Sequence, residues 1–105
     1  MEAGELTRLK LVTVVAETVL RERITRRLLE WGATGFTVIE SNGKGSRGIR
    51  SGDVPGEGVR IEAVVDAETA ERILNGVSDR YFENYAVIAW VSDVQVVRGQ
   101  KYVKS

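Results

Sequence analysis

Apolar segments of strand length divide the chain into four main extended elements and a short fifth one. The nearly continuous apolar, β-branched run at residues 9–16 is typical of a strand that is covered on one face and flanked on the other. Residues 35–40 alternate aromatic and branched side chains, and residues 59–65 alternate apolar with mostly polar positions, which predicts one buried strand face. Residues 86–91 form a short apolar strand, and residues 94–97 form a second extended piece.

Apolar residues that recur every three or four positions indicate two amphipathic helices. The first begins near Thr18, a candidate N-cap, and ends before Gly32, which stands where a residue with positive φ is expected. Its other faces are polar, and we assign Arg23 to the solvent side. The second helix follows Asp66 as its candidate N-cap. The apolar stripes are Leu20, Ile24, Leu28 and Trp31 in the first helix, and Ala70, Ile73, Leu74 and Val77 in the second.

This order of elements predicts an α+β fold of the ferredoxin-like βαββαβ type, in which both helices lie on one side of a four-stranded antiparallel sheet. The other sheet face carries more apolar residues from 9–16 and 86–91 than a solvated surface should expose. We therefore expect a second subunit to bury it in a homo-oligomer. The alternative is that the tail and helices of the same chain cover part of that face.

The composition fits one domain over residues 1–105 and excludes several classes of function. No segment reaches the roughly 18 apolar residues of a membrane span, and no secretory signal is evident, so we expect a cytoplasmic protein. The chain has no Cys and no His, which excludes thiolate nucleophiles, imidazole bases and imidazole metal ligands.

The distribution of charge points to an anion in the first half of the chain. The formal net charge is +0, which argues against a general nucleic-acid partner. Residues 1–50 nevertheless hold nine basic and six acidic groups, whereas residues 51–105 hold six and nine. We expect an anion to bind near the first helix or the glycine-rich loop that follows it.

The segment 41–57 holds five glycines and the only proline, and it predicts a long loop with the composition of a phosphate site. Gly43 and Gly45 let backbone N–H groups converge on an anion, while Lys44, Arg47 and Arg50 supply charge and Ser46 a hydroxyl. Residues 43–48 match G-x-G-x-x-G, but no helix follows, so the dinucleotide-fold interpretation fails. The alternative is a solvated loop with incidental arginines.

Three stretches, residues 9–17, 32–52 and 79–97, resemble the PII signalling superfamily, and more narrowly the PII-like proteins of the SbtB type that accompany bicarbonate transporters or carboxysome genes. Gly-Lys-Gly-Ser-Arg with an arginine three residues later is the most specific part. The resemblance implies a homotrimer that binds adenine nucleotides in clefts between subunits. It also implies that residues 41–57 form the T-loop and residues 98–105 a C-terminal tail.

The resemblance further implies which residues contact the nucleotide. The T-loop set, next to the phosphate, is Gly43, Lys44, Gly45, Ser46, Arg47 and Arg50. The second set, in the turn after the second helix whose backbone would face the adenine, is Asn84, Tyr85, Ala86 and Val87. Val87 stands where the family often has glycine, which narrows the adenine pocket. Of the three aromatic residues Tyr81, Phe82 and Tyr85, we expect at least two to serve packing rather than base stacking.

The resulting interpretation is a regulatory protein, not an enzyme. AMP, ADP, ATP or cyclic AMP is the expected ligand, bicarbonate a second one, and a membrane bicarbonate transporter or a carboxysome component the expected partner. The alternative is a small phosphatase or nucleotide hydrolase that uses the same loop, but the loop's only carboxylates are the distal Asp53 and Glu57. An RNA-binding sheet is the weakest interpretation, because residues 9–16 and 59–65 contain no aromatic side chain.

Overall fold

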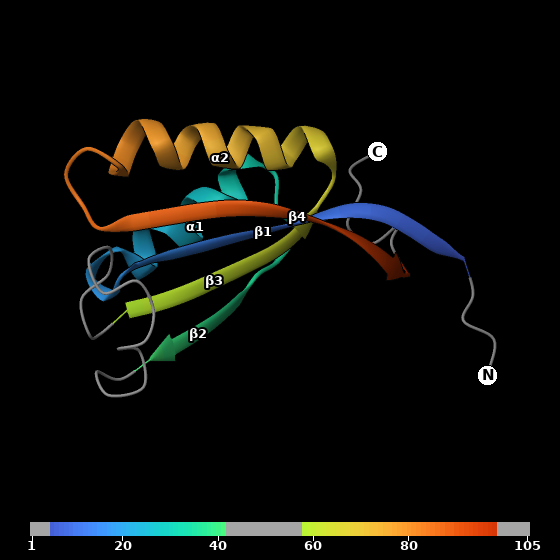
Figure 1. Cartoon of the computed structure of the whole chain (residues 1–105), viewed down its shortest axis with the longest axis horizontal. Helices are drawn as coiled ribbons and strands as arrows, with labels where there is room; N and C mark the ends of the chain where they lie inside the picture. Colours follow the sequence, from blue (N-terminus) through green and yellow to red (C-terminus); the bar gives the residue numbers. More distant parts are fainter. Residues whose placement is uncertain (1–4, 42–57, 99–105) are drawn as a thin grey trace.

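The computed structural model describes residues 5–41 and 58–98, which form two helices, a short 3₁₀ turn and one sheet. Their order confirms the ferredoxin-like βαββαβ arrangement (Figure 1). The elements are β1 (Leu6–Glu17), η1 (Thr18–Leu20), α1 (Arg21–Trp31), β2 (Thr37–Ser41), β3 (Gly58–Val65), α2 (Ala67–Tyr81) and β4 (Val87–Val97).

The four strands form one antiparallel sheet in the order β2-β3-β1-β4, with both helices on the same face (Figure 1). Val14 of β1 lies opposite Ile61 of β3 and Ala89 of β4. Because side chains alternate along a strand, these three residues share one face. The two longest strands, β1 and β4, pair from Leu6–Val97 at one end to Ala16–Val87 at the other.

The hydrophobic core lies between the helices and the alternate residues of β1 and β3. Every second residue of β3 is buried, as its alternation predicts. The apolar stripes of both helices face these strands, with Leu20, Ile24 and Leu28 from the first helical segment fully buried. The core positions of the sheet are Val12, Val14, Ala16, Val59, Ile61, Ala63 and Val65.

The helix boundaries confirm two sequence predictions and correct a third. The side chain of Asp66 accepts a hydrogen bond from the Thr69 N–H at 2.9 Å and caps α2, and Gly32 has a φ of 120° after α1. Thr18 is not an N-cap, because η1 intervenes and α1 begins only at Arg21 without a side-chain cap.

β4 is one continuous strand, so the division into a strand at 86–91 and a separate piece at 94–97 is wrong. The polar residues Ser92 and Asp93 suggested a break, but both stay in register opposite β1, and Asp93 pairs with Lys10 there. β1 likewise exceeds the predicted range of 9–16. None of the helices in the described ranges has the length and apolar content that a membrane span requires.

The helix-free face of the sheet carries a half-buried apolar surface. Its members come from three strands and are Leu11, Val15, Val64, Ile88 and Trp90. Thr13 lies among them, is 0% exposed, and has a hydroxyl without a hydrogen-bond partner in the described part of the chain. The guanidinium of Arg60 lies 5.7 Å from the centre of the Trp90 ring. This is the apolar excess that the sequence predicted, and neither α1 nor α2 covers it.

Gly76 allows α2 to approach α1. A Cβ atom at this position would lie 2.4 Å from Cζ2 of Trp31, the last residue of α1. Such a distance is far inside van der Waals contact, so the indole occupies the space that a methyl group would need. The close packing of the two helices therefore depends on a glycine inside α2.

We predict that Gly76→Ala destabilises the protein. Alanine gains about 1 kcal/mol of helix propensity, but overpacking against Trp31 costs about 1–3 kcal/mol. We expect the free energy of unfolding in urea to fall by about 1 kcal/mol. Gly35→Ala is the control, because a Cβ there meets nothing within 4 Å.

A double-mutant cycle identifies the cause. In a Trp31→Ala background, Gly76→Ala should become stabilising, since only the propensity term remains. A loss of equal size in both backgrounds would show that the indole does not set the penalty.

Candidate functional site

Only part of the predicted nucleotide site lies among the described residues. The T-loop set, Gly43, Lys44, Gly45, Ser46, Arg47 and Arg50, lies outside the described residues. The second set is described: Asn84 and Tyr85 belong to the turn 82–86, Ala86 ends it, and Val87 is the first residue of β4. Tyr81 is the last residue of α2, directly before this turn.

At one end of the sheet, this turn lies together with the last residues of β1 and β2 and the first residue of β3. Ser41, the last residue of β2, and Glu17, the last residue of β1, both lie opposite Gly58, the first residue of β3. Ala16 lies opposite Val87. The described structure therefore stops at Ser41 and resumes at Gly58 at the same end of the sheet as the turn 82–86, with β1 between β3 and β4 (Figure 1). The register brings the turn and the residues that flank segment 42–57 to one end of the sheet.

Glu17 fastens the turn to the end of β1. Its Oε2 accepts a hydrogen bond of 2.7 Å from the backbone N–H of Ala86, in a partly buried position. The predicted backbone donor at Ala86 is thus already engaged by a carboxylate. Sequence analysis missed Glu17, and its only signal was a charged residue directly after the buried run of β1.

Tyr81 and Tyr85 pack together at the same turn. Tyr81 is 6% exposed, its ring meets that of Tyr85 edge to face at 6.1 Å, and the Tyr85 N–H donates to the Tyr81 carbonyl at 3.0 Å. Tyr81 and Tyr85 thus pack against one another, and their predicted role in packing rather than base stacking stays a prediction. Phe82 is 46% exposed.

Arg23 is exposed, as the sequence predicted, and it also contacts the turn. Its Nη1 donates to the hydroxyl of Tyr85 at 3.1 Å and links α1 to the turn. Arg23 and Tyr85 line a hollow of about 550 Å³ together with Arg27, Asp79, Arg80 and Asn84. The turn is therefore flanked by arginine side chains from both helices.

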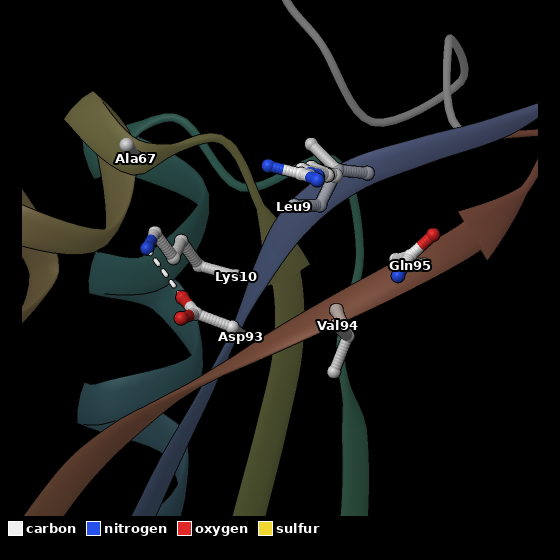
Figure 2. A pocket seen from close by; sticks show the side chains of 7 residues that line it. Leu9, Lys10, Ala67, Asp93, Val94 and Gln95 are labelled. Atoms are coloured by element: carbon white, nitrogen blue, oxygen red, sulfur yellow. Dashed lines mark hydrogen bonds and ion pairs between the residues drawn. The ribbon is translucent and has the colours of Figure 1, made fainter.

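A second hollow, of about 630 Å³, lies near the start of α2 and is lined by Arg8, Lys10, Ala67, Asp93 and Gln95 among others. Figure 2 shows Lys10 and Asp93 pointing toward one another beside Ala67. The hydrogen bond and charge of Lys10 lower the pKa of Asp93. This carboxylate offsets the charge of Lys10 in the hollow.

The described ranges contain no group of three or more His, Cys, Asp or Glu side chains that could hold a metal ion. The chemistry that the described site offers is that of hydrogen-bond donors and guanidinium charge. It can bind an anion through Arg23, Arg27 and Arg80 and pack an apolar ring against Tyr85.

We predict that Glu17→Ala loosens the turn. A hydrogen bond to a charged group contributes about 1.5–3 kcal/mol, so the free energy of unfolding should fall by about that amount. Glu17→Gln should recover part of the loss, because the amide carbonyl still accepts a hydrogen bond. Amide exchange at Ala86 should accelerate in both variants.

Glu83→Ala is the matched control, since it removes an exposed carboxylate from the same turn. Unchanged stability and unchanged Ala86 exchange in Glu17→Ala would show that this contact does not hold the turn.

This chain is similar to a known protein family and to several solved structures. The model of the family described as nitrogen regulatory protein P-II matches residues 9–101. The crystal structure of a PII-like signalling protein from Thermus thermophilus is 49% identical, with a TM-score of 0.80, and the match covers 94% of this chain and 99% of that one.

Two structures of CPII from Thiomonas intermedia are also similar to this chain. The structure bound to ADP, AMP and acetate is 29% identical, with a TM-score of 0.78 and coverage of 95% and 99%. The structure bound to ADP and bicarbonate is 30% identical, with a TM-score of 0.75 and coverage of 93% and 97%.

Proposed function

The chain belongs to the P-II family of nitrogen regulatory proteins, and on that premise we propose that it is a trimeric regulator that binds adenine nucleotides and signals through its T-loop. Its role is regulatory rather than catalytic, in keeping with a family of signalling proteins.

The observation that carries the proposal is the ligand content of similar structures. CPII, up to 30% identical over nearly the whole of both chains, has been solved with ADP, with AMP and with bicarbonate. Coverage of 93–95% of this chain supports a similar ligand site here. ADP, AMP and bicarbonate are therefore the first ligands to test.

The proposed nucleotide site joins the turn 84–87 to the base of the T-loop. Asn84, Tyr85, Ala86 and Val87 contribute the adenine side, and the T-loop residues from Gly43 to Arg50 contribute the phosphate side. The register supports this pairing, since β2 ends and β3 begins at the same end of the sheet as the turn. Guanidinium groups suit phosphate because they donate two parallel hydrogen bonds.

The proposed trimer buries the helix-free face of the sheet. Contiguous apolar residues there, among them Val15, Ile88 and Trp90, would otherwise remain partly in water.

We propose that the process under regulation is the uptake or handling of inorganic carbon. Bicarbonate in CPII supports bicarbonate as a second ligand, and the resemblance to SbtB-type proteins supports a bicarbonate transporter or a carboxysome component as the partner. We propose that the protein acts in the cytoplasm, where the concentrations of adenine nucleotides reflect the energy state of the cell.

We predict that Arg47→Ala and Arg50→Ala weaken ADP binding. Each removes a charge-assisted hydrogen bond, which corresponds to a loss of affinity of roughly 10- to 150-fold in calorimetric titration. Arg47→Lys should restore only part of it, because an ammonium lacks the planar two-pronged donor geometry.

Arg72→Ala is the charge-matched control, from an exposed position on α2. Equal losses in the control and in Arg47→Ala would indicate a diffuse field effect in place of a phosphate contact.

We also predict a trimer in solution. Light scattering should give three times the chain mass of 11.6 kDa at micromolar concentration. Ile88→Lys should dissociate it, because a charge would enter the helix-free face, whereas Val19→Lys on the exposed surface of η1 should not. A stable monomer of the wild-type chain would contradict the proposed assembly.

A further inference from the structure

Three arginines converge on one hollow between the two helices and the turn 82–86. Arg23 and Arg27 lie one helical turn apart on α1, and Arg80 lies in the last turn of α2. All three line the hollow of about 550 Å³ with Asp79, Asn84 and Tyr85. Two separate elements therefore aim guanidinium groups at a common space.

These charges are incompletely neutralised. Arg27 pairs with Glu30 at 2.9 Å, but Arg23 donates to the neutral hydroxyl of Tyr85. Arg80 has no ion pair or side-chain hydrogen bond among residues 5–41 and 58–98. Asp79 is the one carboxylate that lines the hollow with them in the described part of the chain.

The balance of charge around the hollow favours a bound anion. Asp79 offsets one of the three guanidinium groups and Glu30 pairs with Arg27, which leaves an excess of one positive charge, and the C-terminal end of α2 offsets only about half an elementary charge. Guanidinium groups that line one hollow repel one another, and an oxyanion between them would relieve that repulsion.

The donors also suit an oxyanion. The Tyr85 hydroxyl accepts from Arg23, which leaves its own proton to donate, and the Asn84 amide adds two more donors. Guanidinium forks match the paired oxygens of a phosphoryl group.

We infer that the hollow formed by Arg23, Arg27, Arg80 and Tyr85 binds a phosphoryl group. The source is either free inorganic phosphate or a phosphate of the bound nucleotide. The second case rests on the proposed function, whereas the first does not.

Two titrations test the inference on the full chain. The first follows the midpoint of thermal unfolding as inorganic phosphate is added at constant ionic strength, balanced with sodium chloride. The second measures ADP affinity by calorimetry. Both compare the wild type with Arg80→Gln, Tyr85→Phe and the control Arg72→Gln, which removes the same charge from an exposed position elsewhere on α2.

Phosphate should raise the midpoint of the wild type and of Arg72→Gln alike. Arg80→Gln should need roughly 10- to 150-fold more phosphate for the same rise. Tyr85→Phe keeps the ring packed on Tyr81 and should weaken the response by a smaller factor. If Arg80→Gln keeps wild-type ADP affinity, the hollow takes free phosphate. If its ADP affinity falls by a similar factor, the hollow holds the nucleotide's phosphoryl group.

Equal behaviour of Arg80→Gln and Arg72→Gln in both titrations would overturn the inference, as would stabilisation by bicarbonate without any by phosphate. Failure of the proposed function is a separate outcome, because it would appear as no ADP binding by the wild type.

Discussion

Burial of alternate β1 and β3 residues against the stripes of α1 and α2 is the contact on which the rest of the structure depends. β1 is a central strand, paired with both β3 and β4, and it supplies Val12, Val14 and Ala16 to the core. Because the side-chain period of a strand is two, fixing these residues toward the helices commits Thr13 and Val15 to the opposite face. The orientation of β1 therefore places one set of its side chains in the core and the other set on the apolar surface available to another subunit.

The same register sets which segments share one end of the sheet. The strand ends that flank segment 42–57 lie at the end of the sheet that also carries the turn 82–86, and Glu17 joins that turn to β1. The contact between Arg23 and Tyr85 joins the turn to α1 as well. The turn is therefore in contact with both a central strand and a helix. In the proposed function, these contacts would pass the effect of a bound nucleotide from the turn to the rest of the domain.

Features that depend on local pattern were predictable from the sequence, and features that depend on long-range contact were not. The alternation of β3, the stripe of α2, the Asp66 cap and the positive φ at Gly32 are all encoded within a few residues. The bond between Glu17 and Ala86 joins residues 69 positions apart, and no local spacing signals it. Arg23 is a solvated helix residue, as predicted, but its hydrogen bond was not predictable, because its partner, Tyr85, comes from a distant turn. The continuity of β4 was missed for the same reason, since the pairing of Asp93 with Lys10 of β1 outweighs its polar character.

The central claim, that the turn after α2 and the base of the T-loop form one adenine-nucleotide site, is tested most directly by backbone amide chemical shifts of isotopically labelled protein during an ADP titration. The account predicts saturable shifts at residues 84–87 and at 43–50, together with smaller ones at Glu17. Shifts absent from these residues, or confined to the hollow beside Lys10 and Asp93, would contradict it.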